Sequence, residues 1–81
     1  MTGPYNIAQE VVNELDRAQK MFGRIHNPHE ALAIIREEYK EFEEEVFRHN
    51  LTKMRDCRSQ MRAELIQLAA MCLRTIHDCI D

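Results

Sequence analysis

Residues 65–73 read LIQLAAMCL, and Gln67 is the only residue in this stretch that is not apolar. A helix that is apolar nearly all the way round must be covered on every side. The chain has 81 residues, which are too few to surround this helix completely, and a domain of that length is marginal on its own. We therefore expect a second copy of the chain to cover the outer face, giving a homo-oligomer, either a dimer or a tetramer.

The stretch belongs to a chain whose composition is typical of helical proteins. The sequence has two glycines, two prolines and no tryptophan, and 31% of its residues are charged, which leaves little material for turns. Apolar residues recur at steps of three and four along two long segments, as they do along the contact face of a bundle helix. These positions are Leu32, Ile35, Tyr39, Phe42 and Val46 in the first segment, and Met54, Cys57, Met61, Leu65, Leu68, Cys72, Ile76 and Cys79 in the second.

Capping residues place the ends of the expected helices. Asn27 can cap a second helix over residues 28–49, because the following proline suits the first helical position. We expect a first helix from a cap at Asn6 to Gly23, where glycine permits a left-handed cap, preceded by a loose arm at residues 1–5. Thr52 is the expected cap of a third helix that continues to the C-terminus. The predicted fold is a single all-α domain over residues 1–81, a three-helix protomer whose second and third helices pair with a second copy into a four-helix bundle.

Charge and cysteine content narrow the functional classes. The formal net charge is −3 with both signs interspersed, which argues against nucleic-acid binding. No apolar run reaches 18 residues and no signal peptide opens the chain, so we expect no membrane association. The three cysteines form no paired motif and fall within helical patterns. We interpret them as buried, reduced thiols, which favours a cytoplasmic protein.

Glutamates are concentrated in the second helix. On a helix that advances about 100° per residue, Glu38, Glu41 and Glu45 fall within roughly 60° of one another, beside the apolar face. The remaining members of this run, Glu37, Glu43 and Glu44, point toward water. Such a run is also compatible with a solvated helix face whose glutamates pair with lysine or arginine four residues away.

A second acidic position, Glu64, lies at the edge of the apolar face of the third helix, with Gln67 on the same side. Carboxylates that converge between two packed helices repel each other unless a cation joins them. Oxygen ligands of this kind suit magnesium, with manganese as the alternative. The two strips together therefore predict a divalent metal site between the second and third helices.

In order and spacing, these strips resemble the MazG-like family of all-α nucleoside triphosphate pyrophosphohydrolases. That family is marked by E-E-x-x-E followed, after a spacer, by E-x-x-D. Here the first part is Glu37-Glu38-x-x-Glu41, and the second, after 22 intervening residues, is Glu64-x-x-Gln67. The resemblance covers nearly the whole chain. In one position the chain departs from the pattern, because Gln67 stands where the motif has aspartate, and we expect this to lower metal affinity.

The resemblance implies Mg²⁺-dependent hydrolysis of a nucleoside triphosphate to a nucleoside monophosphate and pyrophosphate. It implies Glu38, Glu41, Glu64 and Gln67 as metal ligands, and Glu37 or Glu45 as the group that positions the attacking water. Phosphate binding also requires cations, and Arg62, Arg74 and Lys53 are the candidates near the second strip. Two other interpretations remain open: a catalytically weak or inactive nucleotide-binding or regulatory module, favoured by Gln67, and a structural helical adaptor. The sequence leaves the base and sugar preference open.

Overall fold

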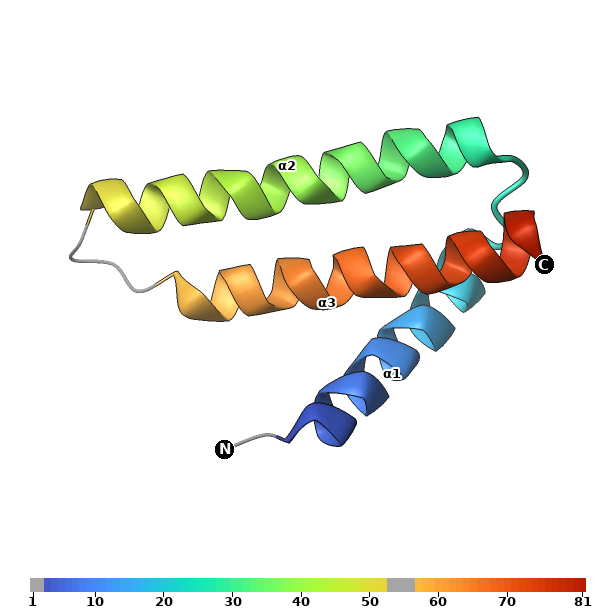
Figure 1. Cartoon of the computed structure of the whole chain (residues 1–81), viewed down its shortest axis with the longest axis horizontal. Helices are drawn as coiled ribbons and strands as arrows, with labels where there is room; N and C mark the ends of the chain where they lie inside the picture. The colour runs from blue at the N-terminus through green and yellow to red at the C-terminus, as the bar shows by residue number, and fades with distance from the viewer. Residues whose placement is uncertain (1–2, 53–56) are drawn as a thin grey trace.

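The computed structural model describes residues 3–52 and 57–81, and they form three helices. The order is α1 (Pro4–Phe22), α2 (Pro28–Thr52), α3 (Arg58–Thr75) and a terminal π-helical turn, η1 (Ile76–Ile80). Figure 1 shows α2 and α3 side by side and antiparallel, with α1 crossing the C-terminal half of α3 at an angle. The predicted all-α, three-helix fold is confirmed.

The first helix begins earlier than the sequence predicts. Gly3 is its N-cap residue and Pro4 its first helical residue, and the backbone amides of Asn6 and Ile7 each donate to the Gly3 carbonyl at 3.1 Å. Proline fits this position because its ring fixes a helical φ and no amide hydrogen is needed there. The predicted cap at Asn6 is therefore wrong, as is the assignment of residues 4–5 to a loose arm.

The connection between α1 and α2 follows the predicted caps. Gly23 ends α1 with φ of 71° and ψ of −157°, a conformation almost restricted to glycine. The side chain of Asn27 then accepts a hydrogen bond from the Glu30 amide at 2.9 Å. The Glu30 carboxylate accepts in return from the His26 amide at 3.2 Å. Asn27 thus pairs one of the amides that the first turn of α2 leaves open, and Glu30 ties the connector to the helix.

The boundaries of the other two helices differ from the prediction. Helix α2 continues three residues past His49, so Thr52 is its last residue and does not cap α3. Helix α3 begins at Arg58 with Cys57 as its N-cap residue, and it gives way to the π-helical turn after Thr75. The expected positions Lys53 and Met54 lie outside the described residues.

A small core forms where the α1–α2 connector meets the start of α2 and the end of α3. Ile25, Ala31 and Met71 are buried, and three partly buried hydrophobic residues pack against them. The terminal turn fixes the connector through polar contacts: the buried Asp78 carboxylate accepts a hydrogen bond from the Ile25 amide at 2.9 Å. Arg24 donates to the Asp78 carbonyl at 3.0 Å.

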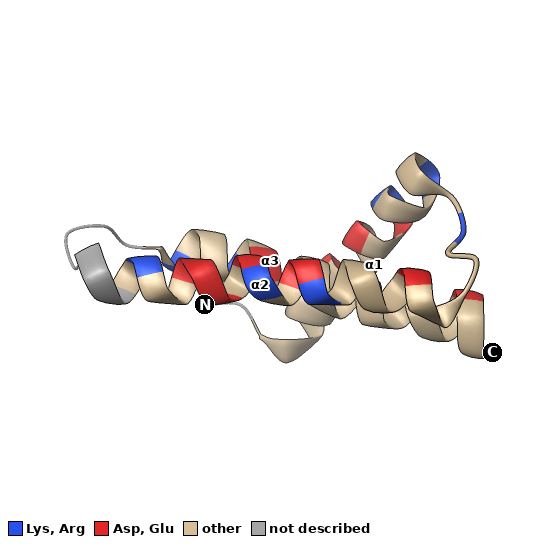
Figure 2. Ribbon diagram, turned by 90° about the horizontal axis from the view of Figure 1, so that it is seen from above, with Lys and Arg blue, Asp and Glu red and all other residues tan. Residues whose placement is uncertain are grey.

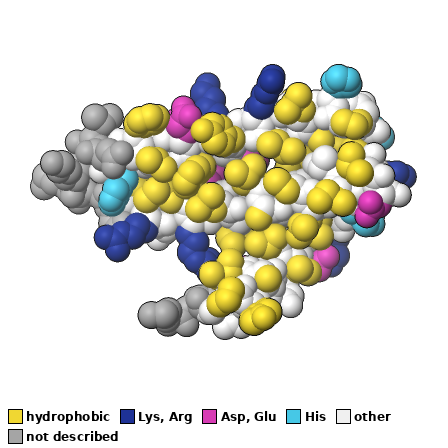
Figure 3. Space-filling model, in the orientation of Figure 1, with side chains coloured by type: hydrophobic (Ala, Val, Ile, Leu, Met, Phe, Trp, Pro, Cys, Tyr) yellow, Lys and Arg dark blue, Asp and Glu magenta, His cyan; other side chains and the backbone are white. Residues whose placement is uncertain are grey.

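Much of the predicted apolar face lies on the surface of the protomer. Tyr39 is 56% exposed, Leu32 and Leu65 are each 45% exposed, and the predicted burial of Cys72 is wrong. Figure 3 shows hydrophobic side chains gathered over α2 and α3 on one face. The radius of gyration is 13.9 Å, whereas a compact domain of this length has about 12 Å. The protomer is thus extended, and it leaves apolar surface uncovered.

Figure 2 shows basic and acidic residues on α1 and α2, whereas residues 65–73 of α3 carry no charge. None of the helices in the described parts of the chain combines the length and the apolar character needed to cross a membrane.

The backbone at Gly23 gives a direct test of this fold. We expect Gly23→Ala to lower the free energy of unfolding by roughly 1–3 kcal/mol, because alanine is strained at the positive φ of this residue. Urea denaturation at a fixed protein concentration measures the change. Gly3→Ala is the matched control, since an added Cβ meets nothing within 4 Å at either glycine and Gly3 has a φ of −77°. Equal losses in the two variants would contradict the expectation.

Candidate metal centre

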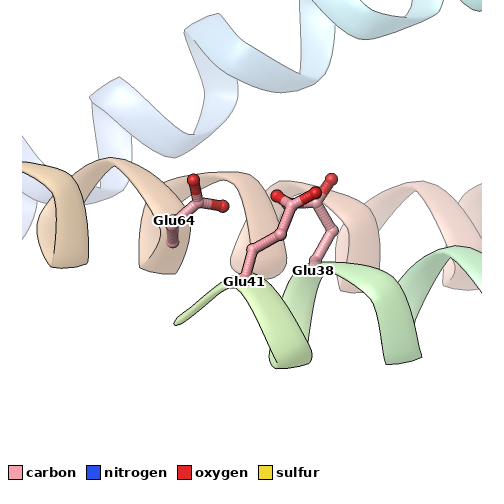
Figure 4. Close-up of side chains that lie close together, drawn as sticks. All are labelled: Glu38, Glu41 and Glu64. Carbon is pink, nitrogen blue, oxygen red and sulfur yellow. The ribbon is translucent and has the colours of Figure 1, made fainter. Parts of the chain in front are cut away.

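Three glutamate side chains from two helices converge at one point beside the core. Glu38 and Glu41 extend from α2 and Glu64 from α3, and one carboxylate oxygen of each lies within 4.8 Å of the others. Figure 4 shows the three carboxyl groups pointing toward the same side of the α2–α3 pair. The predicted convergence of these residues is confirmed.

Helix periodicity explains why only some glutamates of α2 take part. Glu38, Glu41 and Glu45 are all partly buried on the flank of α2 that faces α3, whereas Glu37 and its neighbours Glu43 and Glu44 are exposed. The split follows from the rotation of about 100° per residue. The acidic run therefore divides into a solvated group and an inward group, as the spacing predicts.

Burial and mutual repulsion alter the acidity of the cluster. Burial, followed by a hydrogen bond to Glu41 and the charges of its neighbours, raises the pKa of Glu64 from 4.5 to about 7. Burial and the charge of Glu41 likewise raise the pKa of Glu38. Without a cation, the cluster therefore holds a proton near neutral pH, because a proton on Glu64 relieves repulsion between adjacent carboxylates.

The cluster has the chemistry of a divalent cation site. With the carboxyl groups ionised, Glu38 Oε2 and Glu64 Oε2 are buried acceptors that no donor in the described part of the chain contacts. Buried acceptors of this kind are costly unless a donor or a cation satisfies them. The three carboxylates form an all-oxygen donor set, which suits Mg²⁺ or Mn²⁺. The residues present therefore fit a metal of this class.

A pocket of about 590 Å³ opens next to the cluster, between the three helices. Its lining mixes four glutamates and three arginines with apolar side chains. The lining residues are Glu14, Arg17, Ala18 and Phe22 of α1, Arg24 and Ile25 of the connector, Glu30, Ile34, Glu38 and Glu41 of α2, and Gln67, Ala70, Met71 and Arg74 of α3.

The other predicted site residues occupy different surroundings. Gln67 lines the pocket beside Glu38 and Glu41. Glu45 forms an ion pair with Arg48 through one carboxylate oxygen, while its other oxygen is buried and contacts no donor among the described residues. Of the two residues predicted to position water, Glu37 is exposed, whereas Glu45 is partly buried and its charge acts on Glu64.

Of the three predicted phosphate-binding residues, the structure brings one to the pocket. Arg74 lines the pocket and is only 5% exposed. Arg62 instead forms a bidentate ion pair with Glu10 of α1, and this pair holds the pKa of Glu10 below its ordinary value. Lys53 lies outside the described residues.

The sequence did not identify the contribution of α1 to this pocket. Glu14 and Arg17 line it and pair with each other. Their spacing of three residues fits an ion pair on any solvated helix, so the sequence pattern does not distinguish them from ordinary surface residues. Arg24 and Ile25 of the connector were also missed, because residues between two helices carry no periodic signal.

Proton release should couple metal binding to pH. The folded pKa of Glu64, about 7, lies above its ordinary value of 4.5. Its contribution to the free energy of unfolding is therefore largest below about pH 4.5 and declines as the pH rises to about 7. Metal must displace this proton, so we expect Mn²⁺ to raise the melting temperature more at pH 8 than at pH 6.

Two variants isolate the effect. Glu64→Gln should weaken the stabilisation by Mn²⁺ at both pH values and, without metal, should be more stable than the wild type at pH 8, since one repulsive charge is gone. Glu44→Gln changes an exposed glutamate of the same helix and should behave like the wild type. Equal stabilisation by Mn²⁺ in all three proteins would show that the cluster does not bind the ion.

Comparison of the chain with protein-family models, with curated proteins and with solved structures finds no match.

Proposed function

We propose that the protein is a Mg²⁺-dependent nucleoside triphosphate pyrophosphohydrolase, which hydrolyses a nucleoside triphosphate to a nucleoside monophosphate and pyrophosphate. The observation that carries the proposal is the convergence of Glu38, Glu41 and Glu64 beside a pocket of about 590 Å³. Two of their buried oxygens, Glu38 Oε2 and Glu64 Oε2, have no donor among the described residues. The resemblance of the two glutamate strips to the MazG-like motif supports the same reaction.

In this proposal Glu38, Glu41 and Glu64 hold the metal, and Gln67 adds a neutral oxygen. When bound, Mg²⁺ neutralises charge on the phosphoryl oxygens and orients a water molecule for attack. Glu45 is placed to accept a hydrogen bond from that water, because its buried Oε2 lacks a donor among the described residues and its charge acts on Glu64. Gln67 supplies one negative charge fewer than the aspartate of the motif, so the proposed site binds metal more weakly than a four-carboxylate site.

A second candidate function rests on the same glutamine. With three formal charges in place of four, the site can bind a nucleotide and metal without turning the substrate over. The protein would then be a nucleotide-binding or regulatory module with the same fold. The two functions predict the same ligand, and they differ only in whether pyrophosphate is released.

We also propose that the exposed apolar face of α2 and α3 joins two protomers into a four-helix bundle. Tyr39 and Leu65 are both substantially exposed on these helices, and apolar surface of this kind is characteristic of an interface between subunits. The extended shape of the protomer supports this assembly, since pairing along α2 and α3 would cover the surface that the three helices leave open.

A pyrophosphate-release screen tests the enzymatic function. With Mg²⁺ or Mn²⁺, we expect release from at least one nucleoside triphosphate or deoxynucleoside triphosphate, and a loss of at least about a hundredfold in kcat for Glu41→Gln, which removes one ligand charge. Glu44→Gln is the control and should retain wild-type activity. Release that is unaffected by Glu41→Gln would contradict the proposed site.

The same screen separates the two candidate functions. A binding module would show nucleotide-dependent thermal stabilisation without release, and Gln67→Asp would then restore measurable turnover by adding the missing charge. A protein that neither releases pyrophosphate nor gains stability with any nucleotide would contradict both candidates.

The assembly is tested by the mass of the particle in solution. We expect the wild type to sediment as a dimer or a larger oligomer, and Leu65→Glu to shift it toward the protomer, because a charge would be buried in the interface. Val12→Glu is the matched control, since Val12 is also exposed (39%) but lies on α1. A protomer mass for the wild type at micromolar concentration would rule out the proposed bundle.

A further inference from the structure

The buried arginine of α3 has donor capacity that the fold does not use. Arg74 is 5% exposed, and its Nη2 donates to the Gly23 carbonyl at 2.8 Å. Its Nη1 contacts only the sulfur of Met71, at 3.9 Å, and its Nε contacts no acceptor in the described segments. A guanidinium carries five N–H donors and no acceptor. A buried one with unused donors leaves a place for an acceptor on a ligand.

The surroundings favour a neutral acceptor over an anion. The carboxylate of Asp78, one turn further along the chain, is also buried, and the charge of Arg74 contributes to lowering its pKa. The positive charge of Arg74 is therefore already partly balanced. Arg24 also lines the pocket, but one of its nitrogens already donates to the Asp78 carbonyl. Ala18, Ile34 and Ala70 add apolar lining, and an anion among such side chains would lose hydration without full compensation.

An aromatic ring is also part of the pocket lining. Phe22 lines the pocket while remaining 67% exposed, so a face of the ring is open to a flat partner. A mostly apolar pocket with one buried donor and one accessible aromatic ring is typical of a site for a heteroaromatic group.

The distance between Arg74 and the carboxylate cluster determines how a ligand would be oriented in the pocket. On α3, Arg74 is ten residues from Glu64 of the cluster and seven from Gln67, which lines the same pocket. These separations correspond to about 15 Å and about 10 Å along the helix axis. They are comparable to the reach from the phosphates of a nucleotide to the far edge of its base. A ligand whose phosphates lie at the glutamates would thus place its base against Arg74 and Phe22.

We propose that the Arg74 guanidinium donates a hydrogen bond to an oxo group on the base, so that the site selects bases with a 6-oxo or 4-oxo group over their amino counterparts. This inference rests on the proposed function only for the position of the phosphates. The selectivity follows because an arginine can only donate, and an amino group at the same position presents hydrogens to it. Hypoxanthine is selected over adenine, and uracil over cytosine.

The Nε–H signal of arginine allows a direct test by ¹H–¹⁵N NMR on the wild-type protein. The protein is titrated, with Mg²⁺ present, with the monophosphates of inosine, adenosine, uridine and cytidine, and with ribose 5-phosphate. We expect the Arg74 Nε–H signal, assigned by its loss in Arg74→Lys, to shift with the inosine and uridine compounds. Little or no shift is expected with the other three ligands.

Each other result overturns the inference. Equal shifts with all four nucleotides would remove the selectivity, and an equal shift with ribose 5-phosphate would identify a phosphate subsite in place of a base subsite. The absence of any shift at millimolar ligand would show that Arg74 is purely structural. Monophosphates are not turned over, so these outcomes do not depend on whether the protein releases pyrophosphate.

A kinetic comparison extends the test to turnover. For the wild type we expect kcat/KM to be about tenfold higher for inosine triphosphate than for adenosine triphosphate, the effect of one hydrogen bond to a charged donor. In Arg74→Met the ratio should fall to about one, with folding checked by circular dichroism. A preference that persists in Arg74→Met would overturn the role of Arg74. Absence of turnover with every nucleotide would instead count against the enzymatic proposal.

Discussion

Repulsion among the carboxylates of Glu38, Glu41 and Glu64 is the constraint on which the rest of the structure depends. Two helices that pack along their length bring these groups within 4.8 Å, where they cannot all remain charged without a counter-ion. Without a metal, a proton on Glu64 relieves the repulsion, and a divalent cation would do so more completely. The hydrophobic core offsets this repulsion, because Ile25, Ala31 and Met71 pack together and hold the same two helices in place.

The pocket and the core are consequently formed by the same helices and share residues such as Ile25 and Met71. Helix α1 packs on α3, and each of the two helices contributes a buried alanine to the pocket lining, Ala18 and Ala70. The chain therefore lines one cavity with both charged and apolar side chains. This mixture is the physical basis for proposing a nucleotide as the ligand.

Local signals in the sequence predicted the end of α1, the start of α2 and the inward group of glutamates. Asn27 and Gly23 act through interactions with residues a few positions away, so their roles can be recognised without tertiary information. Periodicity also separates Glu38 from Glu37, because rotation about the helix axis determines which side each one faces. The start of α1 was missed because Asn6 is a strong capping residue, and Gly3 and Pro4 were therefore assigned to a loose arm.

Other features depend on contacts that no local pattern encodes. Periodicity marks Tyr39 and Leu65 as apolar positions, but it does not indicate whether a residue faces its own protomer or another. The pairing of Arg62 with Glu10 joins residues 52 positions apart, so no pattern within α3 could predict it. Ile25 carries no periodic signal, although it is among the most buried residues of the described chain.

The contacts between the terminal turn and the α1–α2 connector have a consequence for the order of folding. The hydrogen bond between Asp78 and Ile25 spans 53 positions and that between Arg74 and Gly23 spans 51, so the core closes a loop that contains all of α2 and most of α3. Closing such a loop has an entropic cost that local helix formation does not. The helical hairpin should therefore form before the core does, and a nascent chain cannot complete its hydrophobic centre until its last turn has been synthesised.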